Sequence, residues 1–120
     1  MSLDSTHKTT RGDIYYVNFG DGPGSVIHGI RPALIIQNNT ANRFSSTVIV
    51  AAITTGIKKL KQPTHVMIGK RFGLAKDSML LLEQIFTIDK TSLIEYIGSA
   101  SPDFMQTVNK AYALSIGLTR

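Results

Sequence analysis

Cysteine is absent from this chain of 120 residues. Disulfides, cysteine ligands and cysteine nucleophiles are therefore excluded, which suits a cytoplasmic protein. No apolar run approaches the ~20 residues that a membrane span needs, so we expect no membrane association. The N-terminal segment is polar and lacks the apolar core of a signal peptide. We expect residues 1–10 to be a flexible tail or an expression remnant and residues 11–120 to form one domain.

Acidic residues are missing from the middle of the chain. No Asp or Glu occurs between Asp21 and Asp77. A purely basic interval attracts polyanions, because each neutralised phosphate releases condensed counterions. The alternative is a solvated basic surface that keeps the protein soluble. The basic residues of this interval are Arg31, Arg43, Lys58, Lys59, Lys61, Lys70, Arg71 and Lys76.

Two apolar runs flank a polar segment inside the acid-free interval. Ala33–Ile36 and Val48–Ile53 are rich in β-branched residues and too short for a typical helix, so we predict two strands. Between them, Gln37–Ser46 is predicted to be a turn segment, because its Asn side chains favour turns. If the two strands pair antiparallel, Arg31 and Thr54 come to the same end of the sheet.

A fixed cation beside a hydroxyl group is suited to anchor a phosphate. Arg31 stands at the entrance of the first strand, and Thr54 stands at the exit of the second. The simpler interpretation is that Arg31 is a surface charge and Thr54 an ordinary strand-end residue. The pattern of residues leaves both interpretations open.

Other short strands are predicted on both sides of this pair, and one helix follows them. Ser101 is a good helix N-cap, Pro102 fits the first helical position, and Gly117 is a suitable terminator. The pattern predicts a mainly β fold with a C-terminal α-helix, in which the helix packs on a small, partly closed β-barrel. The further predicted elements are strands at Ile14–Phe19, Pro63–Ile68 and Ser78–Ile85, a mobile glycine-rich loop at Gly20–Gly29, and a strand or helical turn at Leu93–Ile97.

Few other side chains are candidates for chemistry. His7, His28 and His65 lack the spacing of metal ligands, so no metal site is expected. His28 could touch a ligand from the glycine-rich loop or be an ordinary loop residue, and His65, within a predicted strand, is more simply structural. Glu83 and Gln84 end a predicted strand, where alternation points them to opposite faces unless a bulge intervenes. Each of these two side chains could hydrogen-bond a base edge.

Several sequence motifs occur in a fixed order over nearly the whole domain. They read RGDIYYVNF, GIRPALIIQNN, NRF-S-TVIVAAIT, PTHV and DSMLLLEQI-TIDK. In order and spacing they resemble the MazF/PemK toxins, in particular the Gram-positive MazF branch, from Arg11 to about Leu118. These toxins are endoribonucleases of bacterial type II toxin–antitoxin systems. The resemblance implies a homodimer of small SH3-like barrels, of the CcdB/PemK plasmid-maintenance toxin type, each with a C-terminal helix.

The resemblance also implies an activity and a set of site residues. It implies sequence-specific, metal-independent cleavage of single-stranded mRNA without a cofactor, and inhibition by an acidic, MazE-like antitoxin. The catalytic arginine and threonine of the family fall on Arg31 and Thr54. Together with the glycine-rich loop and the basic interval, the resemblance leads us to expect RNA contacts at Ser25, His28, Lys59, Glu83 and Gln84.

A mechanism follows from the chemistry of RNA. The 2′-OH of RNA is the nucleophile, so the enzyme need not supply one. Its attack on the adjacent phosphate gives a 2′,3′-cyclic phosphate and a 5′-OH fragment, and Arg31 and Thr54 would stabilise the charge that develops on the phosphoryl oxygens. Arginine stays protonated, so an electrostatic role suits Arg31 better than the role of base; His28 or a water could take the proton.

Two other functions remain open on the sequence. One is a binding protein of the same fold that does not cleave RNA and acts on a protein target such as gyrase. The other is a generic single-strand-binding barrel, which requires stacking aromatics among its basic residues. Only Phe44 and Phe72 lie in the acid-free interval, which argues against the second. The chain departs from the family pattern at Val26, Ile27, His28, Met67 and Phe86, so the cleavage site of a relative does not transfer to it.

Overall fold

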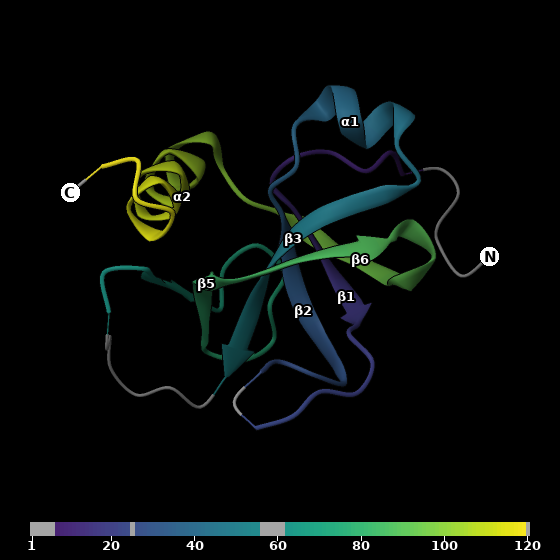
Figure 1. Cartoon of the computed structure of the whole chain (residues 1–120), viewed down its shortest axis with the longest axis horizontal. Helices are drawn as coiled ribbons and strands as arrows, with labels where there is room; N and C mark the ends of the chain where they lie inside the picture. Colours follow the sequence, from purple (N-terminus) through teal and green to yellow (C-terminus); the bar gives the residue numbers. More distant parts are fainter. Residues whose placement is uncertain (1–6, 25, 56–61, 120) are drawn as a thin grey trace.

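The computed structural model describes residues 7–24, 26–55 and 62–119. It is mainly β with a C-terminal helix (Figure 1), which confirms the predicted class. No helix in these ranges is long and apolar enough to cross a membrane. The elements are β1 (Asp13–Asn18), β2 (Ile30–Ile35), α1 (Asn39–Phe44), β3 (Thr47–Thr55), β4 (His65–Gly69), β5 (Ser78–Asp89), the 3₁₀ turn η1 (Lys90–Ser92), β6 (Leu93–Ser99) and α2 (Pro102–Ser115).

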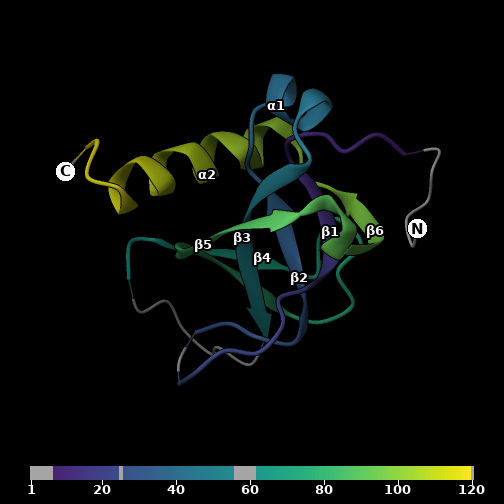
Figure 2. The same cartoon turned by 45° about the vertical axis from the view of Figure 1, so that its right-hand side comes forward.

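The six strands form one antiparallel sheet in the order β4-β5-β3-β2-β1-β6. This sheet curls on itself, as Figure 1 and Figure 2 show from two directions. The segment between β4 and β5 reaches the opposite edge strand, β6. A Cβ atom added to Gly98 would lie 2.0 Å from the carbonyl oxygen of Phe72. Backbone of the two edges of the sheet therefore meets at a point where only glycine fits.

The curled sheet buries apolar side chains on both of its faces. Ile14, Leu34 and Leu80 belong to a cluster that the apolar stripe of α2 covers. Tyr15, Ala33 and Val50 belong to a second cluster on the other face, where α2 contributes nothing. Along β2, Ala33 and Ile35 lie in the second cluster and Leu34 between them lies in the first, as the period of two requires. The α2 side chains in the first cluster are Phe104, Met105, Val108 and Ala111.

The register between β3 and β5 shifts in the middle of the sheet. Ala51 pairs with Ile85, whereas the next residue, Ala52, pairs with Leu81. The β5 residues from 82 to 84 therefore form a bulge, which bends the strand. Because β5 continues through this bend to Asp89, it is longer than the predicted Ser78–Ile85 strand.

The prediction of a turn segment at Gln37–Ser46 was wrong in part, because a short helix, α1, lies inside it. Asn38 is the N-cap, and its side chain accepts a hydrogen bond from the Ala41 backbone N–H at 2.8 Å. Asn is as good a helix cap as a turn former, so its presence does not distinguish the two. Asn42 is buried and exchanges amide hydrogen bonds with Gln37. These buried polar contacts stabilise α1. The helix has no apolar stripe, so the sequence pattern does not predict it.

The C-terminal helix begins and ends as predicted. The Ser101 hydroxyl accepts from the Phe104 backbone N–H, and Pro102 opens the helix. Gly117 follows the C-cap with a φ of 79°, a conformation that favours glycine. The ambiguous segment beginning at Leu93 is a strand, β6, and β2 begins at Ile30 rather than at Ala33.

We expect Gly98→Ala to destabilise the fold through the contact between the sheet edges. An added methyl group has no room beside the Phe72 carbonyl, and overpacking of this kind typically costs about 1–3 kcal/mol. Gly24→Ala is the matched control, because no atom lies within 4 Å of its added Cβ and only its φ of 55° is unfavourable. Urea unfolding should show the larger loss for Gly98→Ala; equal losses would contradict the close approach.

Candidate functional site

Arg31 and Thr54 lie at the same end of the sheet, as the predicted strand pairing requires. β2 and β3 are antiparallel, and Ala33 pairs with Ala52. When this register is continued by two residues, Arg31 stands opposite Thr54. A step of two along each strand keeps both side chains on one face. The sequence pattern alone could not give this register, but the pairing brings the two residues together as expected.

The Arg31 side chain is held by the glycine-rich loop. Its Nε donates to the carbonyl oxygen of His28 at 2.9 Å, and the side chain is half-buried. No acidic side chain pairs with Arg31 in the part of the chain that the structure describes. The loop therefore orients the guanidinium group without neutralising its charge, as an anion-binding group requires.

The Thr54 hydroxyl has only a weak internal partner among the described residues. It donates to the Thr55 carbonyl oxygen at 3.4 Å, which is long for a hydrogen bond between oxygens. Thr54 is half-buried and pairs across the sheet with Met79. Its hydroxyl can therefore turn toward an acceptor on a ligand at little cost.

An apolar cluster lies beside this pair and anchors the glycine-rich loop to the sheet. Ile27 is only 9% exposed and packs with Ala52, Met79 and Leu81. The Ile27 backbone N–H also donates to the side-chain oxygen of Gln84 at 3.1 Å. The Ile27 end of the loop, predicted to be mobile, is thus attached by one apolar and one polar contact next to Arg31.

The bulge in β5 directs Glu83 and Gln84 to different partners. Gln84 holds the loop, whereas Glu83 accepts from the Thr64 hydroxyl at 3.0 Å and lies 2.9 Å from His65 Nε2. His65 is buried, and this contact with Glu83 supports its structural interpretation. His28 is exposed, and its Nδ1 lies 3.0 Å from the Val26 carbonyl oxygen. Of the predicted RNA contacts, Ser25 and Lys59 lie outside the described residues.

A cavity of about 190 Å³ adjoins the Arg31 end of the two strands. Lys76 lines it, so a second cation of the acid-free interval joins Arg31 there. No local sequence signal places Lys76 at this cavity, because its position depends on the path between β4 and β5. The other lining residues are Tyr16, Ile30, Pro32, Ile53, Thr55, Leu74, Ala75 and Ser78.

The cations of the acid-free interval that the structure describes do not share one end of the β2–β3 pair. Arg31 and Lys76 lie at one end of the β2–β3 pair, whereas Arg43 lies on α1 at the other end. Arg71 donates to the carbonyl oxygens of Ile68 and Met67 and lies over the Phe104 ring, so it is partly structural. No three His, Cys, Asp or Glu side chains gather as metal ligands within the described ranges.

Comparison with known proteins gives concordant matches. Residues 10–116 match the family model described as PemK-like, MazF-like toxin of type II toxin–antitoxin system. Endoribonuclease EndoA of Bacillus subtilis is 49% identical over 109 residues, which cover 90% of this chain and 94% of the relative.

Solved structures show the same fold. A mycobacterial endoribonuclease in complex with its cognate antitoxin has a TM-score of 0.77 at 29% identity, covering 93% of this chain and 98% of that one. MazF from Deinococcus radiodurans also has a TM-score of 0.77, at 19% identity, over 92% of this chain and 98% of that one. At that identity the second match shows the fold alone.

Gln84→Ala should loosen the glycine-rich loop without unfolding the sheet. The substitution removes the acceptor of the Ile27 N–H, and a net hydrogen bond of about 0.5–1.5 kcal/mol corresponds to roughly three- to tenfold faster amide exchange. Gln84→Glu keeps an acceptor oxygen and should retain the protection. Hydrogen exchange followed by NMR at Ile27 measures the difference, and unchanged protection in Gln84→Ala would show that the apolar cluster alone holds the loop.

Proposed function

This chain belongs to the PemK-like, MazF-like toxin family of type II toxin–antitoxin systems, and we propose that it is an endoribonuclease toxin that cleaves single-stranded mRNA at a specific sequence. The observation that carries the proposal is the placement of Arg31 opposite Thr54, beside an anchored loop. The name of the Bacillus subtilis relative supports the reaction class. We infer that the curled sheet is the SH3-like barrel of this family.

In the proposed reaction the 2′-OH of RNA attacks the adjacent phosphorus, and the bond from phosphorus to the 5′ oxygen of the next nucleotide breaks. The products are a 2′,3′-cyclic phosphate and a 5′-OH. The phosphoryl oxygens gain negative charge in the transition state, and donors already in place stabilise it most effectively. Arg31 fits this role because His28 takes up its Nε and leaves the terminal nitrogens for the phosphate.

Thr54 supplies the second donor in the proposed reaction. Its hydroxyl stands on the same face as Arg31, and its 3.4 Å contact with the Thr55 carbonyl is readily exchanged for a phosphoryl oxygen. The guanidinium group stays protonated at neutral pH. We therefore assign Arg31 to charge stabilisation. We assign removal of the 2′-OH proton, and its delivery to the departing 5′ oxygen, to His28 or a water molecule.

The family also suggests partners for this chain. We propose a homodimer that is inhibited by an acidic, MazE-like antitoxin whose disordered segment folds on contact with the basic site. One mycobacterial structural relative is described as an endoribonuclease in complex with its cognate antitoxin, which supports this proposal. The cations at the site, Arg31 and Lys76, would be neutralised by such a segment.

Cleavage of a long RNA in EDTA should produce 5′-OH ends at a recurring sequence, and sequencing those ends gives the cleavage motif. Arg31→Ala and Thr54→Val should each reduce the rate about 100- to 1000-fold, because each removes one donor to the developing charge. Thr54→Ser keeps the hydroxyl group and should retain most of the activity. A single 2′-deoxy nucleotide at the cleaved position should abolish cleavage there, because the nucleophile is lost.

Lys110→Ala on α2 is the surface control for these variants and should cleave at the rate of the parent protein. Cleavage that persists in Arg31→Ala would contradict the catalytic assignment. If the RNA stays intact while the protein inhibits gyrase, the non-cleaving alternative is correct. Circular dichroism of each variant shows whether it is still folded, and so distinguishes loss of catalytic activity from unfolding.

A further inference from the structure

A second cationic pocket lies at the other end of the β2–β3 pair from Arg31. It occupies about 490 Å³ between the N-terminal segment, α1 and η1. Figure 1 shows α1 and the 20–29 loop at opposite ends of the sheet. Three cations, Lys8, Arg43 and Lys90, line the pocket, and none of the acidic residues that the structure describes does. The remaining lining residues are Thr9, Thr10, Asn39 and Asn42.

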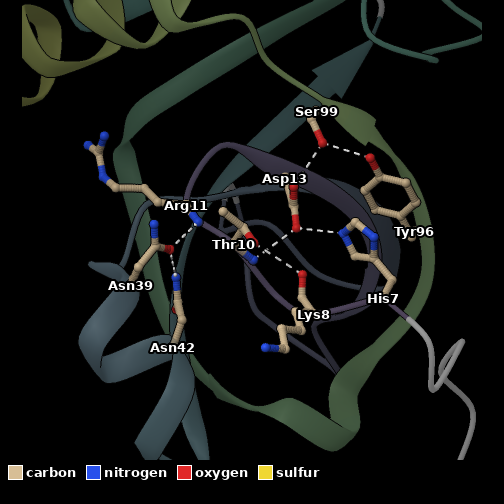
Figure 3. Close-up of polar contacts among 9 residues, drawn as sticks. All are labelled: His7, Lys8, Thr10, Arg11, Asp13, Asn39, Asn42, Tyr96 and Ser99. Carbon is tan, nitrogen blue, oxygen red and sulfur yellow. Dashed lines mark hydrogen bonds and ion pairs between the residues drawn. The ribbon is translucent and has the colours of Figure 1, made fainter.

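One wall of this pocket is fixed by a buried carboxylate. Asp13 is 3% exposed and accepts hydrogen bonds from the Thr10 backbone N–H at 2.9 Å and the Ser99 hydroxyl at 2.8 Å. His7 Nε2 lies 2.8 Å from the same carboxylate, and its ring stacks on Tyr96 at 3.7 Å (Figure 3). The segment assigned to a tail by sequence thus contacts the domain from His7 onward and holds Lys8 in place.

The N-terminal wall of the pocket, formed by Lys8, Thr9 and Thr10, is also joined to α1. The Arg11 backbone N–H donates to the Asn39 side-chain oxygen at 2.7 Å, and Asn42 donates to the same oxygen at 3.0 Å (Figure 3). On the third side, Lys90 Nζ donates to the Asn42 carbonyl oxygen. The pocket is therefore built by hydrogen bonds from three separate parts of the chain. These bonds fix the backbone that carries Lys8 and Arg43 and hold the Lys90 ammonium group in place.

The charges of Lys8 and Arg43 have no acidic partner among the described residues. Both oxygens of the buried carboxylate at Asp13 are already engaged by hydrogen-bond donors. A concave site with uncompensated cations and no acid attracts an anion. The amide and hydroxyl groups of the lining can hydrogen-bond the oxygens of that anion, as phosphate requires.

An exposed aromatic ring adjoins the pocket. Phe44 is 75% exposed, and the Arg43 guanidinium carbon lies 5.3 Å from its ring centroid. In proteins that bind single-stranded nucleic acids, basic side chains contact the backbone, and bases stack on solvent-exposed aromatic rings beside them. The other aromatic of the acid-free interval, Phe72, packs against Phe104 and is not available in this way.

We propose that the pocket lined by Lys8, Arg43 and Lys90 binds a backbone phosphate of single-stranded RNA while Phe44 stacks on a neighbouring base. This inference rests on the proposed function, because it adds an accessory site for the same substrate. From Arg31 to the start of α1 the strand advances roughly 20 Å, at about 3.3 Å per residue. Small barrels engage roughly 4–16 nucleotides of single strand, so one RNA can reach both ends.

The aromatic ring favours RNA over an acidic peptide as the occupant. Glutamate and aspartate side chains would satisfy the cations but carry no planar group to stack on Phe44. A nucleotide offers both a phosphate and a base, at neighbouring positions of one chain. Phosphate contacts and stacking are largely independent of sequence, so the accessory site would strengthen binding without choosing the cleavage motif.

Binding of an uncleavable RNA tests the proposal separately from catalysis. Fluorescence anisotropy with 2′-O-methyl oligoadenylate and oligouridylate of about 16 nucleotides measures affinity, because these strands lack the 2′-OH nucleophile. Lys8→Gln combined with Arg43→Gln should weaken binding about tenfold and lower the slope of log K against log salt by roughly 0.7, the value for one lost phosphate contact on a single strand. Phe44→Ala should weaken binding about tenfold with the slope unchanged.

The matched control is Lys70→Gln combined with Lys110→Gln, which removes the same charge from exposed positions elsewhere. This control should reduce the affinity for RNA less than the Lys8 and Arg43 double variant does. An equal loss would mean that only net charge matters and would contradict the proposal that the pocket binds RNA.

Other outcomes separate this inference from the proposed function. If the parent protein cleaves RNA but the pocket variants bind the long strand like the control, the accessory site is wrong and the endoribonuclease proposal stands. If a polyglutamate peptide loses affinity in the pocket variants while RNA does not, the occupant is an acidic protein segment and the RNA assignment is overturned. Loss of cleavage in Arg31→Ala with unchanged long-strand binding supports two separate sites.

Discussion

The pairing register of β2 with β3 is the constraint on which the candidate site depends. Ala33 opposite Ala52 fixes Arg31 opposite Thr54, and a slip of one residue would turn one of the two side chains to the other face of the sheet. Ala33 and Ala52 on one face and Leu34 and Ala51 on the other are all fully buried, so burial on both faces specifies this register. Because Ala52 is small, Ile27 can pack beside it, and the loop then brings His28 to Arg31.

The bulge in β5 completes the site from the opposite strand. A regular strand would point Glu83 and Gln84 to opposite faces. The shift between Ala51 and Ala52 instead lets Gln84 reach the Ile27 amide while Glu83 reaches the buried His65. One irregularity thus fastens the loop to the sheet and the start of β4 to β5. Irregularities of this kind are frequent beside active sites because they redirect single side chains.

Much of this arrangement could be predicted from the sequence, and the parts that could not have physical reasons. The central strands and the capped C-terminal helix carry strong local patterns. Antiparallel pairing brings Arg31 and Thr54 to the same end of the sheet, whereas their register across the strands has no local signal. Helix α1 was missed because its stability comes from the buried amides of Asn42 and Gln37 rather than from an apolar stripe. Lys76 could not be placed because neither the path after β4 nor the register shift has a local signal.

The described cations of the acid-free interval are divided between two separate surfaces of the folded protein. The β2–β3 pair carries one part of the interval to each of its ends, with Arg31 at one and Arg43 at the other. Segments outside the interval then complete the second end, because Lys8 and Lys90 come from the N-terminal wall and from η1. Counterion release depends on how many phosphates are neutralised. Under the proposed function, a strand that touches both ends gains more affinity than one confined to the catalytic end, and an antitoxin segment that covers only Arg31 would leave the second pocket open to RNA.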